Sequence, residues 1–121
     1  MSSDRRERDM TLDEFYQEFR EVAPKFEWKL ITRYEKELIR AISKDGDSVE
    51  ICPINAVYWN KTGTLIDVWN VRYAGDVLKL SYDNVSIIMC AADDDIMTLV
   101  RVEDRDKCRN TLLEIAGLSA R

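Results

Sequence analysis

The stretch ICPINAVYWNKTG, residues 51–63, marks the point at which a region of strands gives way to a region of helices. Val49 and Ile51 continue an alternation of apolar residues that is typical of a strand. Pro53 suits the first position of a helix, where its missing N–H is not needed, and Gly63 can adopt the left-handed conformation that ends one. The stretch therefore predicts the end of a strand followed by a short helix.

The residues before this stretch predict one helix and a small sheet. A helix begins at Thr11, carries apolar residues at steps of three and four, and ends at Pro24. Two alternating runs follow, over residues 26–30 and 38–42, with the polar pair Thr32-Arg33 between them. A strong hairpin signal leads into a third strand over residues 48–52, and that signal is Asp45-Gly46. These elements form a three-stranded antiparallel meander.

The residues after this stretch predict helices. One helix begins near Asp67, and a second, more apolar helix follows a break at residues 80–83 and ends at Asp93-Asp94-Asp95. Residues 96–102 fit either a short strand or an extended connection, and Asp104 can cap a last helix that Gly117 ends.

We therefore predict a single α+β domain over residues 11–121, preceded by a flexible N-terminal arm of residues 1–10. Its architecture is an N-terminal helix, a three-stranded antiparallel meander, and then three to four C-terminal helices packed on one sheet face.

The composition is that of a globular, acidic protein. The 121 residues carry a net charge of −5, and 45% of them are hydrophobic while 34% are charged. No apolar run approaches the length of a membrane span, and the N-terminus resembles no signal peptide, so we expect a cytoplasmic protein. The chain has no histidine, which removes the commonest zinc ligand and the commonest general base near neutral pH. We expect neither a cofactor nor catalytic activity.

Two groups of residues nevertheless suggest chemistry. Cys52 directly precedes a helix, whose dipole could lower the pKa of the thiol, but no histidine is available to take its proton. Asp93, Asp94 and Asp95 could supply oxygen ligands to a metal ion, although three consecutive carboxylates cannot all face one ion. The favoured interpretations are an inert core thiol and a solvated loop, and a small enzyme is the third alternative for function.

Residues 70–93 resemble a helix-turn-helix. Gly75 takes the place of the motif's small residue, and Lys79 stands where the turn glycine usually lies. The resemblance implies a nucleic-acid-binding set composed of Arg72, Lys79, Tyr82, Asn84 and Ser86. The recognition helix would offer one amide and no arginine or lysine to a groove, so a simple packed helix pair is the favoured interpretation.

Aromatic residues interleaved with cations indicate a binding surface. Such mixtures anchor protein partners, and the mixed charge around them favours a protein over a nucleic acid. The residues that we assign to partner binding are Trp28, Arg33, Tyr34, Arg40 and Trp59.

Several short elements resemble a set of small uncharacterised bacterial and phage-borne proteins. The resemblance covers most of residues 28–118 and implies no activity. Its elements are Trp28 to Leu30, a Cys-Pro-Ile-x-Ala-Val element at residues 52–57, Lys61-Thr62-Gly63, Leu80-Ser81 and Ala91-Ala92-Asp93.

The leading expectation for function is a small acidic protein-binding module without catalytic activity, of which a phage-type inhibitor or adaptor is an example. The alternative is a helix-turn-helix protein that binds nucleic acid. We expect the partner to be an unidentified protein or a second copy of this chain in a homodimer, with nucleic acid less favoured and no membrane involved.

Overall fold

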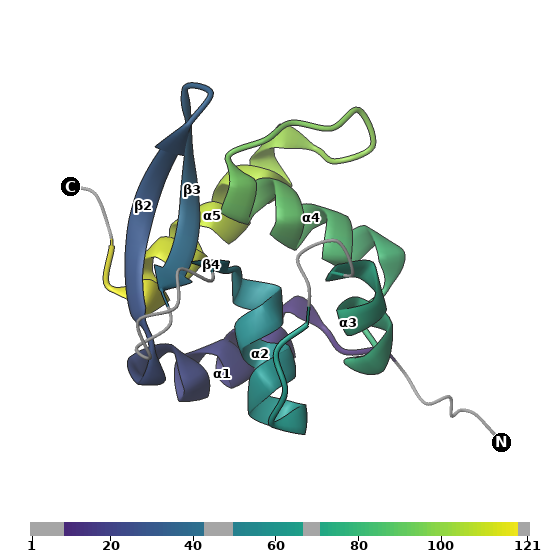
Figure 1. Cartoon of the computed structure of the whole chain (residues 1–121). Coiled ribbons are helices and arrows are strands. Elements are labelled where there is room, and N and C mark those ends of the chain that lie inside the picture. The colour runs from purple at the N-terminus through teal and green to yellow at the C-terminus, as the bar shows by residue number, and fades with distance from the viewer. Residues whose placement is uncertain (1–8, 43–49, 67–70, 119–121) are drawn as a thin grey trace, which may run out of the picture.

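The computed structural model describes residues 9–42, 50–66 and 71–118 (Figure 1). The predicted α+β architecture is confirmed: an N-terminal helix precedes a three-stranded antiparallel sheet of order β2-β3-β4, and helices follow. In chain order the elements are α1 (Leu12–Val22), the 3-10 helix η1 (Ala23–Lys25), β2 (Glu27–Arg33), β3 (Lys36–Ile42), β4 (Glu50–Ile51), α2 (Pro53–Thr62), α3 (Val71–Val77), α4 (Tyr82–Asp93) and α5 (Val102–Ala116).

Local signals explain where α1 begins and ends. The Thr11 hydroxyl accepts the backbone N–H of Glu14, and the Glu14 carboxylate accepts the backbone N–H of Thr11, which completes a capping box. Phe15, Phe19 and Val22 bury the apolar face of the helix completely. The chain then tightens into η1, where Pro24 prevents the α-helix from continuing.

The hairpin of β2 and β3 turns later than the sequence indicates. Its register runs from Glu27 opposite Ile42 to Arg33 opposite Lys36, so the polar pair at residues 32 and 33 belongs to β2 and does not separate the strands. The turn consists of Tyr34 and Glu35, which both have positive φ values, 54° and 65°. A tight hairpin turn with this backbone normally contains Asn-Gly. Residues 34 and 35 are not Asn-Gly, which explains why the turn was predicted too early.

The predicted helix after β4 is confirmed as α2. Cys52 occupies the N-cap and its sulfur accepts the backbone N–H of Asn55 at 3.5 Å, while Pro53 takes the first helical position. Gly63 ends the helix with a φ of 80°. The side-chain amide of buried Asn55 donates to the carbonyl of Ile66 and accepts its N–H, which ties the following loop to the helix.

The last two helices differ from the prediction at their starts. Ser81 caps α4 through its hydroxyl, so the helix already begins at Tyr82, and residues 94–101 form a loop rather than a strand. Helix α5 follows Arg101, which makes no side-chain cap, and the predicted capping role of Asp104 is wrong. Asp104 lies inside the first turn, where its negative charge favours the helix dipole without capping the helix.

Several predictions fall on residues that the structure does not describe. These are the arm over residues 1–8, the turn at Asp45-Gly46, the first residues of the third strand and the start of the helix near Asp67. Met10, which we assigned to the arm, pairs with Leu80, and its backbone N–H donates to the Lys79 carbonyl at 2.6 Å. Within the described residues, none of the helices has the length and apolar character needed to cross a membrane.

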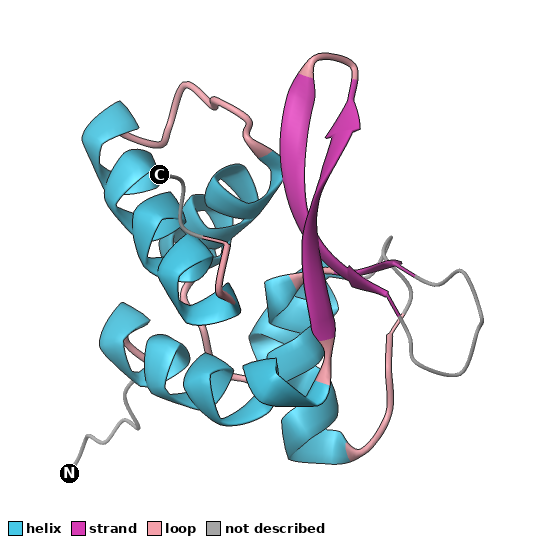
Figure 2. Cartoon of the chain, turned by 90° about the vertical axis from the view of Figure 1, so that its left-hand side faces the viewer, coloured by secondary structure: helices cyan, strands magenta, loops and turns pink. Residues whose placement is uncertain are grey.

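The hydrophobic core lies where the helices meet the sheet. Figure 2 shows the hairpin of β2 and β3 standing beside the helices, with its tip projecting at the end of the molecule opposite α1. Helices α4 and α5 pack against each other, and α4 also contacts β3. The largest fully buried side chains are Phe15, Phe19, Ile39, Ile51, Ile54, Ile88 and Leu112.

We predict that Glu35→Gly stabilises the protein by about 0.5–1 kcal/mol, because glycine adopts positive φ without the steric cost that glutamate bears. Urea unfolding followed by circular dichroism measures the change. Glu37→Gly, the same substitution at an extended position of β3, is the matched control and should lower stability. Equal effects at the two positions would show that the turn is not strained.

Candidate functional site

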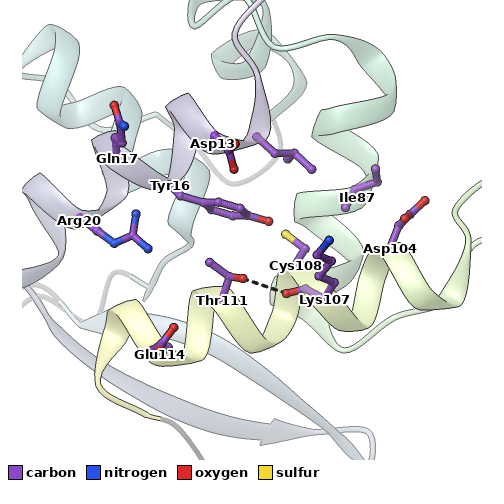
Figure 3. A pocket seen from close by; sticks show the side chains of 11 residues that line it. Asp13, Tyr16, Gln17, Arg20, Ile87, Asp104, Lys107, Cys108, Thr111 and Glu114 are labelled. Carbon is purple, nitrogen blue, oxygen red and sulfur yellow. Dashed lines mark hydrogen bonds between the residues drawn. The ribbon is translucent and has the colours of Figure 1, made fainter.

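An open groove of about 690 Å³ lies between α1 and α5 (Figure 3). Its volume falls in the range of small-molecule pockets. Its walls mix apolar side chains with charges of both signs. The lining residues are Leu12, Asp13, Tyr16, Gln17, Arg20, Ile87, Asp104, Lys107, Cys108, Thr111 and Glu114.

Tyr16 and Cys108 meet inside this groove. The Tyr16 ring crosses from α1 towards α5, and its hydroxyl points at the Cys108 thiol (Figure 3). Burial raises the pKa of Tyr16 far above its usual value, and the hydrogen bond with Cys108 raises the pKa further. Burial also raises the pKa of Cys108, to about 11. Both shifts favour the protonated forms at neutral pH, which opposes a nucleophilic or basic role for either group.

Two residues of the predicted partner-binding set lie inside the protein. Trp28 is only 8% exposed, and its indole N–H donates to the Ala23 carbonyl at 3.0 Å. Arg40 is 7% exposed and donates to Asp93 at 2.6 Å. A partner cannot reach either side chain in this fold, so we remove both from the binding surface.

The other three members lie nearer the surface but not together. Trp59 is half-buried and packs edge-on against Phe26, with its ring centroid 5.3 Å from that of Phe26. Arg33 forms a bidentate ion pair with Glu50, and this pairing lowers the pKa of the Glu50 carboxyl. Tyr34 is 90% exposed at the hairpin tip. Of the predicted set, Tyr34 is the residue best placed to contact a partner.

Further exposed apolar side chains belong to the segment between α4 and α5. Ile96 is 64% exposed, Leu99 is 79% exposed and Val102 is 51% exposed, all in or beside the loop between α4 and α5. Both views place this loop and the hairpin tip at the same end of the molecule (Figures 1 and 2). We name Tyr34, Ile96, Leu99 and Val102 the hairpin-end surface.

Hydrogen bonds hold the two halves of this surface together. The Lys36 ammonium contacts the Asp95 carboxylate at 2.8 Å, and the backbone N–H of Glu37 donates to Asp94 at 3.0 Å. Sequence reasoning missed the surface because residues 96–102 fit either a short strand or an extended connection, and that ambiguity left the exposure of their side chains unpredicted. The available signal was a set of apolar residues at positions 96, 99 and 102 outside any predicted element.

The three consecutive aspartates point at different partners. Asp93 binds Arg40, Asp94 accepts from Arg105 and from the Glu37 backbone, and Asp95 binds Lys36. The Lys36 ammonium lowers the pKa of Asp95. Within residues 9–42, 50–66 and 71–118, no group of three or more acidic or cysteine side chains converges as metal ligands would. The triplet therefore acts as a connection between helices and sheet.

Cys52 borders a small cavity of about 60 Å³, which Arg40, Ile88 and Asp93 also line. The residue is only partly exposed, and the surrounding side chains desolvate its thiol. This desolvation raises the pKa of the thiol despite the hydrogen bond from the Asn55 backbone, which acts in the opposite direction. The geometry thus favours a capping role over a nucleophilic one.

Two local features of the α3–α4 pair are compatible with the predicted helix-turn-helix. Lys79 adopts a φ of 65°, the left-handed conformation that glycine provides in that motif. Gly75 and Val85 are in close contact, since a Cβ atom on Gly75 would lie 2.5 Å from the Val85 side chain. Because Lys79 itself adopts the left-handed conformation, the turn forms without a glycine at position 79.

The predicted nucleic-acid contacts are nevertheless poorly presented. Ser86 is only 3% exposed, and the Asn84 amide donates to the Met10 carbonyl at 3.3 Å. Lys79 and Tyr82 are exposed, Tyr82 at 58%, and acidic Asp83 lies beside Tyr82. The side chain of Arg72 lies outside the described residues.

Comparisons with protein-family models, with curated proteins and with solved structures find no match for this chain. The resemblance to small bacterial and phage-borne proteins therefore stays a prediction.

We predict that Asp93→Ala destabilises the protein by about 2–3 kcal/mol, because it removes the carboxylate that is hydrogen-bonded to the buried Arg40 guanidinium and leaves Glu50, at 3.9 Å, as the remaining acidic partner. Asp95→Ala is the matched control. It removes the neighbouring carboxylate from an exposed ion pair and should cost much less. Chemical denaturation measures both variants. If the two losses are equal, Asp93 does not serve as the counter-ion of a buried charge.

We predict that all three thiols react slowly with an aromatic disulfide reagent in the native protein at about pH 8, because burial raises each thiol pKa. In denaturant the same thiols should react at the rate of a free cysteine. Rapid reaction of Cys52 in the native state would contradict its capping role and support the enzyme alternative.

Proposed function

We propose that this chain is a non-catalytic protein-binding module that contacts its partner through the hairpin-end surface. The observation that carries the proposal is the strong exposure of Tyr34, Ile96 and Leu99 at one end of the molecule. Exposed apolar side chains are unfavourable in water, and their burial by a partner is a source of binding free energy. Apolar side chains exposed together at one end of a molecule are a feature of interaction sites.

The frame beneath this surface supports binding without large rearrangement. Asp94 accepts the Glu37 backbone N–H and the Arg105 guanidinium, so one carboxylate links the hairpin to α5. Asp95 accepts its neighbour Ile96's backbone N–H, which orients the start of the exposed loop. A surface that is ordered before binding loses less conformational entropy when the partner arrives.

The chemistry of the surface favours a protein with an apolar pocket or groove. The charges around it are already paired, as Lys36 is with Asp95 and Arg101 is with Glu103. Paired rim charges offer little net attraction to phosphates, whereas an apolar centre with a polar rim is the usual anatomy of a protein interface. Such a module would occupy the apolar site of another protein, as an inhibitor or adaptor does.

A nucleic-acid-binding function is the second candidate, because Gly75 closely contacts Val85 and Lys79 adopts a left-handed turn conformation, as the predicted helix-turn-helix requires. This function requires that the protein bind duplex DNA with an affinity that falls steeply as the salt concentration rises. The substitution Lys79→Glu must also lower that affinity. The exposed start of α4 carries Tyr82 and Asp83, which supports the protein-binding proposal instead.

The proposal is tested by site-specific photo-crosslinking in host lysate. A photoreactive phenylalanine replaces Leu99 in one version of the protein and Glu21, an exposed residue of α1 at the other end, in the control. We expect a nuclease-resistant adduct with a defined protein from position 99 and none from position 21. Adding Ile96→Asp to the version labelled at position 99 should abolish the adduct, because a charge on this surface opposes its burial by a partner.

Two results would overturn the proposal. The first is the same set of adducts from both positions, which indicates non-specific contact. The second is recovery of nucleic acid with the wild-type protein, with adducts that disappear after nuclease treatment.

A further inference from the structure

We propose that two copies of this chain associate through the outer edges of their β2 strands, in antiparallel register about a two-fold axis at Leu30. The proposal does not depend on the hairpin-end surface. It places the three-stranded sheet of one copy beside that of the other as one continuous sheet. Its basis is the open edge of β2, the direction of its backbone groups and the order of its charges.

Among residues 9–42, 50–66 and 71–118, no strand pairs with the outer edge of β2. The strand is the outermost of the sheet, spans Glu27–Arg33, and runs along the outside of the molecule in both views (Figures 1 and 2). Because the hairpin turn has two residues, Arg33 and Lys36 exchange hydrogen bonds, and every second pair does the same. The backbone groups of Leu30 and Thr32 therefore point away from β3. Among the described residues, no hydrogen bond reaches them.

The other edge of the hairpin supports this assignment. The same alternation points the N–H and carbonyl of Glu37 away from β2. Both groups are satisfied from that side, because the N–H donates to Asp94 at 3.0 Å and the carbonyl accepts from Arg109 at 2.8 Å. One edge of the hairpin is thus closed by side chains, and the edge of β2 is left for a partner strand.

The charges of β2 select one register for self-pairing. An antiparallel ladder forms only where residues whose backbone groups point away from β3, such as Leu30 and Thr32, lie opposite each other. With Leu30 opposite Leu30 of the second copy, Glu27 of each copy faces Arg33 of the other, which gives two attractive pairs. A shift of two residues one way brings Lys29 against Lys29, and a shift the other way brings Lys29 against Arg33. Both shifts place like charges directly opposite each other.

The side chains involved are accessible to a second copy. Leu30 is 37% exposed, so the two-fold axis brings two partly exposed leucines together. The Arg33 side chain is 46% exposed although it pairs with Glu50, and a second carboxylate can still approach it. A pairing over seven residues covers a small area, so we expect a dimer whose population rises with protein concentration.

Sedimentation equilibrium over a range of concentrations tests the association. We expect a reversible monomer–dimer equilibrium for the wild type and a dissociation constant roughly tenfold weaker for Glu27→Arg, because two attractive pairs become repulsive. Glu21→Arg makes the same charge change on exposed α1 and should leave the equilibrium unchanged. A monomer at every concentration, or equal weakening by both substitutions, would overturn the proposal.

Disulfide trapping tests the register. Leu30→Cys places two thiols opposite each other across the axis and should give a covalent dimer under mild oxidation. In this register residue 29 lies opposite residue 31 of the second copy, two positions away from the second residue 29. Lys29→Cys should therefore be trapped much more slowly. Equal trapping of the two variants would contradict the register, and trapping of neither would contradict the pairing of β2.

Discussion

The backbone of Glu37 is the point on which the arrangement of this protein depends. Strand β4 is short and pairs only with the end of β3, so the rest of that edge must find other partners. Asp94 and Arg109 provide them, accepting the Glu37 N–H and donating to its carbonyl. These bonds fix the hairpin against α4 and α5 and give partners to the backbone groups of Glu37.

The aspartate triplet that makes this connection would be unfavourable alone. Negative charges at the C-terminal end of α4 oppose its dipole, and Asp94 adopts a left-handed conformation with a φ of 53°. Arg40 and Lys36 from β3 offset the charges of Asp93 and Asp95. The acidic cluster is therefore explained by the need to attach a helix end to a sheet, and a metal ion is not required to account for it.

The limits of sequence-based prediction follow the range of the interactions. The ends of α1 and α2 are set by Thr11, Pro53 and Gly63, whose effects are local, and they could be predicted. The partners of the triplet in β3 lie more than fifty residues away in the chain, and nothing in a single sequence links them. The candidate site was predicted only at Tyr34, because the loop over residues 96–102 owes its position to that same long-range attachment.

The hairpin tip shows that stability alone does not account for this sequence. Tyr34 and Glu35 both adopt positive φ in a turn that Asn-Gly would form at lower cost, and the Tyr34 ring is almost fully exposed. The attachment of Lys36 and Glu37 to α4 holds the strained turn in place. A small domain has little stability to lose, so the exposed aromatic side chain on a strained turn has no explanation in folding stability and supports the proposed contact with another molecule.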